Sequence, residues 1–125
     1  MATQNTGMKY DGGKLLSSLL YVGLAFELEE ITAVLTYGAQ KYAADSWQSV
    51  PDGRRRYMDA TYRHLTAMAK GELWDEESGL RHVAHAITNL LFISWLDRQE
   101  LVKDSGEDAV TFQAWLTTFN EPPTK

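Results

Sequence analysis

Cysteine is absent from the 125-residue chain, which excludes disulfides, zinc–thiolate sites and thiol nucleophiles. Basic residues are outnumbered as well, with 12 lysines and arginines against 17 acidic residues and a net charge of −5. A nucleic-acid-binding domain would carry a basic footprint, so we expect no nucleic-acid partner. A nucleotide substrate remains compatible with this charge, because bridging cations can hold its phosphates.

Long apolar runs are also absent. The longest is well short of the ~20 residues that span a bilayer, and residues 1–13 lack the apolar segment of a signal peptide. We therefore expect a protein that has no membrane contact and resides in the cytoplasm. The length is that of one domain with one hydrophobic core, so residues 1–125 are predicted to form a single domain.

Strand signals are missing too, because no short run alternates between apolar and polar residues and every periodic segment is helical. The predicted helices span residues 24–44, 54–70, 76–100 and 107–120, after a loop segment at 1–14 and a short helix or apolar lead-in at 15–22. Short connections imply an all-α, four-helix antiparallel bundle, with a C-terminal helix and tail at 107–125. The helix at 76–100 is apolar on nearly every face, so we expect it to be central and partly covered by another subunit of a homo-oligomer.

A polar stripe interrupts this apolar helix. Three consecutive acids at 75–77 precede His82, His85 and Asn89, which fall within an arc of about 60° on one helix face. Burying such a stripe is costly unless it binds something, so the histidines are candidate metal ligands, phosphate donors or a general base. The alternative is that the acids cap the helix N-terminus and the histidines are satisfied core residues.

A second candidate site lies on the helix at 24–44. Glu27 and Glu30 are three residues apart and share one face. Paired carboxylates at a bundle seam can hold Mg²⁺ or Mn²⁺, although a solvated acidic edge is the plainer alternative. Lys41 lies on the same edge as Glu30, about 16 Å further along the helix. This line could span a metal-bound phosphate chain and its nucleoside.

The helix at 54–70 and the loop before it supply further candidates. Arg63 could reach a phosphate, or it could pair with Asp59 while His64 packs in the core. Tyr42 and Trp47 flank the loop and could stack on a base, although aromatic residues at such positions are more often core residues.

Several nucleotide-binding and hydrolase motifs are absent. The chain contains no P-loop, no Rossmann glycine motif and no nucleophile elbow. The His-Asp dipeptide of metal-dependent phosphohydrolases is missing as well. The segment KYDGGK at 9–14 has two glycines that could let the backbone approach a ligand closely, or it is a flexible terminus.

A longer set of motifs occurs in a specific order. It comprises KYDGGK at 9–14, LEE at 28–30, YGAQKY at 37–42, Trp47, RHL at 63–65, GE at 71–72, DEESGL at 75–80 and HVAHA at 82–86. On these residues the chain resembles the dATP/dGTP diphosphohydrolases of phages and bacteria, the phage MazZ type, a branch of the all-α MazG-like nucleotide pyrophosphohydrolases. The resemblance covers most of the chain, roughly residues 9–97.

The resemblance implies metal-dependent hydrolysis of dATP or dGTP to the monophosphate and pyrophosphate, with Mg²⁺ or Mn²⁺. It implies a homodimer or homotetramer in the host cytoplasm that controls the dNTP pool or supplies dGMP for modified-base synthesis. A non-catalytic purine-nucleotide sensor and a purely structural helical module are the alternatives.

The resemblance also suggests roles for the candidate residues. Glu27, Glu30, Asp75 and Glu77 are expected to bind the metal, with Glu30 and His85 in catalysis. The residues expected to bind the substrate are Lys9, Lys14, Lys41, Tyr42, Trp47, Arg63, His64, His82 and Asn89.

The chain departs from the broader MazG-like pattern, which has E-x-x-E on one helix and E-x-x-D on the next. Glu27 and Glu30 match the first half, but His82-Val83-Ala84-His85 stands where the second is expected. Asp75 and Glu77 are the preferred replacements because hard cations favour oxygen ligands. A histidine ligand would shift the preference toward Mn²⁺.

Overall fold

All regular structure in the described residues, 14–104 of this computed structural model, is helical. The elements are α1 (Ser18–Tyr21), α2 (Ala25–Lys41), the 3-10 helix η1 (Ser46–Ser49), α3 (Gly53–Ala69) and α4 (His82–Asp104). Within these residues the prediction of an all-helical chain is confirmed. The helix expected at 107–120 and most of the loop segment at 1–14 lie outside the described residues.

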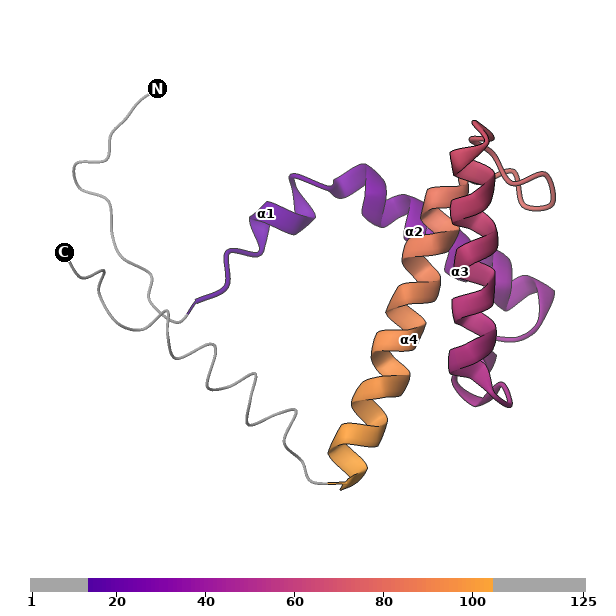
Figure 1. Cartoon of the computed structure of the whole chain (residues 1–125). Coiled ribbons are helices and arrows are strands. Elements are labelled where there is room, and N and C mark those ends of the chain that lie inside the picture. Colours follow the sequence, from indigo (N-terminus) through magenta and orange to yellow (C-terminus); the bar gives the residue numbers. More distant parts are fainter. Residues whose placement is uncertain (1–13, 105–125) are drawn as a thin grey trace, which may run out of the picture.

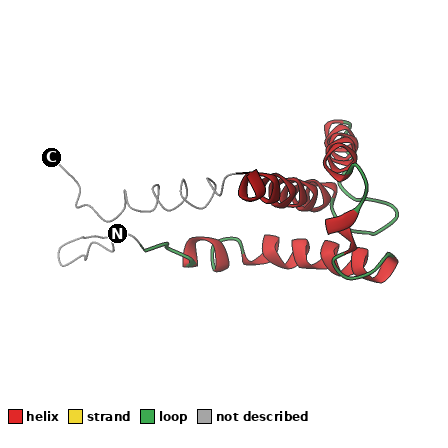
Figure 2. Ribbon diagram, turned by 90° about the horizontal axis from the view of Figure 1, so that it is seen from below, coloured by secondary structure: helices red, strands yellow, loops and turns green. Residues whose placement is uncertain are grey.

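Helix α4 is the central element of the described chain. It runs beside α3 in the opposite direction, and it also packs against α2 (Figures 1 and 2). Arg54 of α3 reinforces the α3–α4 contact by donating to Asp97 of α4 at 2.8 Å. The central position predicted for this helix is therefore confirmed. No helix among residues 14–104 is both long and apolar enough to cross a bilayer.

The predicted start of α4 is wrong. Helix α4 begins at His82 rather than near residue 76, because the acidic segment folds into a loop. The Ser78 amide donates to Asp75 Oδ2 at 2.9 Å, and the Asp75 amide donates to the Leu80 carbonyl at 2.8 Å. Gly79 takes a φ of +77°, which a helix does not allow. The Asp75 carboxylate thus caps a turn and not a helix.

The buried core of the described chain is small. The apolar side chains that it buries are Val34, Ala84, Ala86 and Ile93. Next to this core, Trp47 of η1 stacks on Phe92 of α4 with ring centroids 4.3 Å apart. The segment before and at the start of α2 projects away from α3 and α4 (Figure 1) and exposes Leu15, Leu16, Leu19, Leu20, Tyr21, Val22, Leu24 and Phe26. This exposed set is called the apolar arm below.

Candidate functional site

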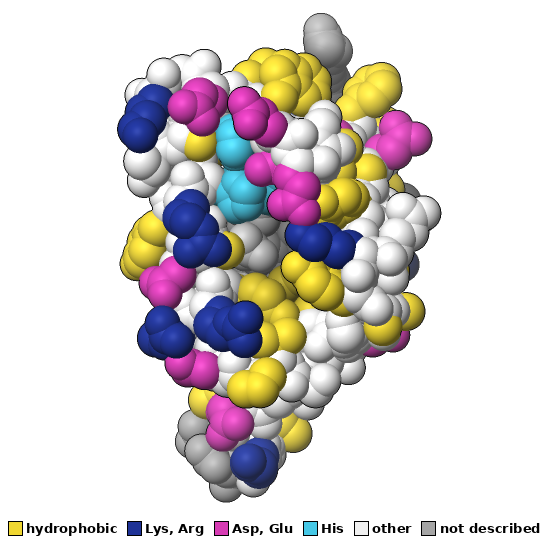
Figure 3. Space-filling view, turned by 90° about the vertical axis from the view of Figure 1, so that its right-hand side faces the viewer, with side chains coloured by type: hydrophobic (Ala, Val, Ile, Leu, Met, Phe, Trp, Pro, Cys, Tyr) yellow, Lys and Arg dark blue, Asp and Glu magenta, His cyan; other side chains and the backbone are white. Residues whose placement is uncertain are grey.

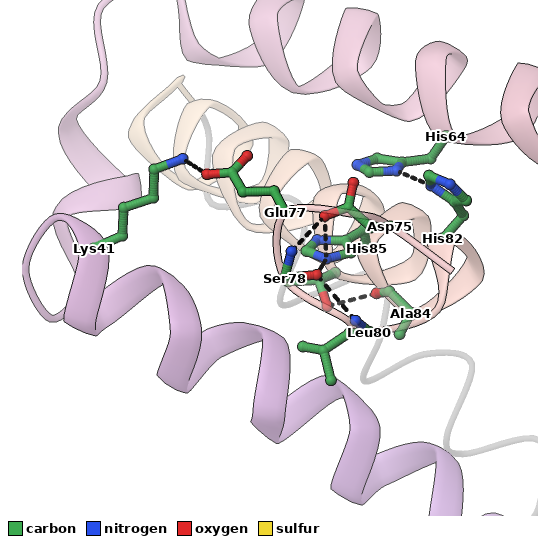
Figure 4. A network of polar contacts seen from close by, with 10 residues as sticks. Lys41, His64, Asp75, Glu77, Ser78, Leu80, His82, Ala84 and His85 are labelled. Carbon is green, nitrogen blue, oxygen red and sulfur yellow. Dashed lines mark hydrogen bonds and ion pairs between the residues drawn. The ribbon is translucent and has the colours of Figure 1, made fainter. Parts of the chain in front are cut away.

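All three histidines of the chain meet where the C-terminal part of α3 faces the start of α4. His64 comes from α3, and its Nδ1 lies 2.8 Å from Nδ1 of His82 (Figure 4). The His64 ring also stacks on the His85 ring, with centroids 4.8 Å apart and planes only 8° from parallel. The polar stripe predicted on α4 is therefore joined by a histidine from a second helix.

The loop between α3 and α4 holds these histidines from the other side. Ser78 Oγ lies 2.7 Å from His85 Nε2 and accepts a hydrogen bond from the Leu80 amide at 3.1 Å. Asp75 Oδ2 lies 3.9 Å from His85 Nε2. Figure 4 shows Asp75 and Ser78 projecting from the loop toward the three rings. The turn chemistry of the loop thus aims a carboxylate and a hydroxyl at the histidines.

Three of these residues can hold one cation. One ligand atom each from His64, Asp75 and His82 lies within 4.8 Å of the other two. Within residues 14–104 this is the one group of three such residues that meets this spacing. Glu27, Glu30 and Glu77, expected with Asp75 around a metal, are not part of the group.

Burial sets the protonation of the cluster. It lowers the pKa of His64, and the neighbouring His85 and His82 lower it further. Burial also lowers the pKa of His85, although Asp75 acts in the opposite direction. Burial raises the pKa of Asp75, but hydrogen bonds from the amide and hydroxyl of Ser78 outweigh it, and the net shift is downward. At neutral pH the rings of His64 and His85 are therefore neutral and lie beside an ionised Asp75 carboxylate.

Two ion pairs tie α2 to this site. Arg81 donates to both carboxylate oxygens of Glu30, with Nε at 2.8 Å from Oε2. Lys41 pairs with Glu77 in the loop (Figure 4). The hydrogen bonds from Arg81 and from Lys41 lower the pKa of Glu30 and Glu77, respectively, so both remain ionised. Two of the carboxylates expected at the metal are thus each paired with a cation.

The remaining candidates are spread over the surface. Glu27 and Asn89 are half-buried, one turn from Glu30 and His85 respectively, whereas Lys14, Tyr42 and Arg63 are exposed. Tyr42 lies under the Lys41 ammonium, 5.2 Å from Nζ to the ring centroid. Trp47 packs on Phe92, away from the histidines along α4. Lys9 lies outside the described residues.

The sequence analysis missed Arg81 and the role of Ser78. Arg81 is 51 residues from its partner Glu30, so no local pattern links them. Ser78 is not among the predicted site residues. Its position seven residues before His85 suits a contact only because the chain turns back at Gly79.

Two hollows lie in the described part of the chain, one beside the histidine cluster and one along α4. The first, of about 620 Å³, is lined by Glu72, Trp74, Asp75, Glu76, Glu77 and His82. Figure 3 shows histidine side chains at the surface there, flanked by acidic ones, with lysine and arginine side chains nearby. The second, of about 290 Å³, is largely apolar and lined by Leu35, Trp47, Thr88, Leu91, Phe92, Ser94, Trp95 and Arg98.

Comparison with known proteins finds one family model that spans all of these residues. A family model described as dATP/dGTP diphosphohydrolase, N-terminal, matches residues 4–105. A curated dATP/dGTP diphosphohydrolase of Salmonella phage PMBT28 is 41% identical over 91 residues, which are 73% of this chain. The chain spans only 30% of the length of that relative. No solved structure matches the chain.

Proposed function

The chain belongs to the dATP/dGTP diphosphohydrolase family, because it matches the model of that family's N-terminal domain. We therefore propose that it hydrolyses dATP or dGTP to the monophosphate and pyrophosphate. The observation that carries the proposal is the cluster of three histidines and Asp75 beside two carboxylate–cation pairs. Such a site offers proton acceptors, metal ligands and phosphate-binding cations within one small region.

The ion pairs suggest how a metal–nucleotide complex is accepted. In the structure Arg81 holds Glu30 and Lys41 holds Glu77. The substrate brings both signs of charge: Arg81 and Lys41 would bind its phosphates, and Glu30 and Glu77, with Glu27 and Asp75 nearby, would hold its divalent cation. This exchange of partners leaves no charge uncompensated. Arg63 and the N-terminal lysines Lys9 and Lys14 are proposed as further phosphate contacts.

His85 is the proposed general base. Its lowered pKa keeps it neutral at pH 7, and Ser78 orients the ring through Nε2. A water molecule that attacks the α-phosphorus gives its proton to the imidazole, while pyrophosphate leaves. Glu30, once released from Arg81, orients that water. A bound Mg²⁺ or Mn²⁺ ion supplies neutralisation of the phosphate charge that develops during the reaction.

The nucleoside is proposed to lie along α4. The second hollow begins near Thr88 and includes Phe92 and Trp95. Phe92 is seven residues after His85, which corresponds to about 10 Å along a helix. That distance suits a nucleotide whose phosphates lie at the histidines and whose base reaches the aromatic residues, including Trp47. Asn89, which lies between His85 and Phe92 in the sequence, is proposed to contact the sugar, and Tyr42 is a second candidate for stacking.

We also propose that the active form is a homodimer or homotetramer. The apolar arm is exposed in one chain, with Phe26 80% and Leu19 70% accessible to solvent. Contiguous apolar surface of this kind marks an interaction site. A second copy that covers the arm would also enlarge the small core.

The test is product analysis with the full chain. We expect dATP or dGTP with Mg²⁺ or Mn²⁺ to yield the monophosphate and pyrophosphate in equal amounts, separated by ion-exchange chromatography. Comparable turnover of dCTP and dTTP would remove the purine preference. Tight binding of dGTP without any product would instead favour a nucleotide sensor.

A further inference from the structure

The contact between His64 and His82 is unusual in its geometry. Their Nδ1 atoms face each other at 2.8 Å. Two lone pairs repel at this distance, so either one ring donates a hydrogen to the other or both lone pairs point toward a shared cation. Asp75 places a carboxylate oxygen within 4.8 Å of a ring nitrogen of each.

The spacing is close to that of two ligands on one ion. Two nitrogens bound to a tetrahedral ion at about 2.0 Å each lie about 3.3 Å apart. The rings therefore need to separate by roughly half an ångström to admit a cation. A small rotation of His64 or His82 about its side-chain bonds supplies such a shift without moving α3 relative to α4.

Neighbouring groups hold these side chains in place, as is usual for residues that bind a metal. His82 is 8% exposed, and the Ser78 amide fixes the Asp75 carboxylate at 2.9 Å. Supporting hydrogen bonds of this kind orient ligands and strengthen metal binding. His85, which stacks on His64 and contacts Ser78, is a further support and not a member of the group.

We propose that His64, His82 and Asp75 together bind one divalent transition-metal ion, such as Mn²⁺, Co²⁺ or Zn²⁺, in preference to Mg²⁺. Two imidazoles and one carboxylate suit these ions, whereas Mg²⁺ selects an all-oxygen set. The inference stands on the geometry of the cluster. It rests on the proposed function only for the use of the bound ion in hydrolysis.

Glu30 and Glu77 are less suited to hold an ion by themselves. Glu30 is bound by Arg81 through two hydrogen bonds, and Glu77 is bound by Lys41. A bare ion would have to displace these cations, and nothing would then compensate them. The histidine group can receive an ion before any nucleotide arrives.

The first test uses the unmodified full chain. Because the sequence has three histidines and all lie in this cluster, ring-nitrogen NMR spectra of histidine-labelled protein report on this site alone. We expect Zn²⁺ to bind at one ion per chain and to shift one ring nitrogen of His64 and one of His82 by direct ligation. A spectrum in which none of the rings changes, or in which only His85 is ligated, would overturn the proposal.

The second test measures affinity by calorimetry with Mn²⁺ and Zn²⁺. His82→Asn and Asp75→Asn should each weaken binding by at least about tenfold, since loss even of a supporting group costs that much. Asn at 75 still accepts the Ser78 hydrogen bond, so the loop should keep its fold. Glu76→Gln, which changes an exposed acid of the same loop outside the group, should bind with affinity close to that of the unmodified chain.

Competition separates this inference from the proposed function. A roughly hundredfold excess of Mg²⁺ should fail to displace Mn²⁺. Metal binding that depends on His82 without pyrophosphate release would uphold the site and contradict the proposed function. Pyrophosphate release with Mg²⁺ alone, unchanged by His82→Asn, would uphold the function and contradict the site.

Discussion

Glu30 has one role that the structure shows and one that the sequence predicts. It is the partner of Arg81, and it is one of the carboxylates expected to act on the substrate. The side chains of the pair are about one-third exposed, 31% for Arg81 and 30% for Glu30, and such pairs contribute little to stability. A substitution at Glu30 should therefore report on catalysis more than on folding.

We expect Glu30→Gln to reduce turnover of the preferred purine dNTP by on the order of 10²- to 10⁴-fold while the helix content stays unchanged. The neutral amide can still accept one hydrogen bond from Arg81, but it cannot offer a negative charge. Steady-state pyrophosphate release and far-ultraviolet circular dichroism check the two halves of this prediction. Chelation of divalent ions with EDTA should stop the unmodified chain, and Mn²⁺ should restore it.

Glu29→Gln is the matched control, because Glu29 is an exposed acid of the same helix. Its turnover should stay close to that of the unmodified chain. Near-normal turnover of Glu30→Gln would mean that Glu30 serves only as the partner of Arg81.

The general-base role of His85 predicts a particular pH dependence. A base works in its deprotonated form, so the rate should rise with pH through the pKa of His85, which lies below its ordinary 6.5, and level off before neutrality. His85→Asn should lower the plateau by about 10²- to 10⁴-fold and remove this acidic limb. An acidic limb that persists in His85→Asn would assign the titration to another group.

At the scale of elements, the loop between α3 and α4 depends on one backbone conformation. Gly79 has a φ of +77°, and an added Cβ would meet no atom within 4 Å. Gly79→Ala should therefore destabilise the chain by about 1 kcal/mol through backbone strain alone. Thermal unfolding followed by circular dichroism should show a melting temperature lower by about 4–8 °C.

Gly38→Ala provides the comparison within a helix. Gly38 lies in α2, and its added Cβ also has open space, so alanine should stabilise the helix by about 0.5–1 kcal/mol. A destabilised Gly38→Ala would indicate that another subunit packs closely against α2. If Gly79→Ala melts like the unmodified chain, the loop conformation is not needed for the fold.

Periodicity was sufficient to predict α2 and α3, because each has a continuous helical pattern between turn residues. It failed at residues 76–81, where an acid-rich sequence suits both a helix N-terminus and a tight turn. The turn forms because the Ser78 amide donates a hydrogen bond to Asp75 and because Gly79 adopts a left-handed backbone conformation. The stripe of His82, His85 and Asn89 followed from helix geometry, but its meeting with His64 depends on how α3 packs on α4.

At the scale of the whole molecule, one chain buries too little apolar surface. Among the described residues only four apolar side chains are buried, whereas large ones such as Leu90 and Leu91 of α4 are about half exposed. A domain of this size normally buries about two-thirds of the surface of its unfolded chain. The distribution of apolar surface therefore favours an assembly of several copies.

We expect light scattering to give the mass of a dimer or tetramer at micromolar concentration. Phe26→Asp should shift the mass toward the monomer, because a charge on the apolar arm opposes burial against a partner. Gln48→Asp, an exposed position outside the arm, should leave the mass unchanged. A monomeric unmodified chain, or a Phe26→Asp variant that assembles normally, would contradict this interface.

All imidazole side chains of the molecule lie in one cluster, and this affects how the stability of the whole protein depends on pH. Between about pH 5 and 7 histidine is the side chain that ordinarily changes charge, and all three histidines of the chain lie at this one site. His64 and His85 have lowered pKa values, hence the unfolded chain binds more protons than the folded one. The free energy of unfolding should therefore fall as the pH drops from 6.5 through those lowered values and then become constant with respect to these two groups. Urea unfolding across this range measures that proton difference directly, and a stability that is flat or rises on acidification would show that the two rings are not held neutral.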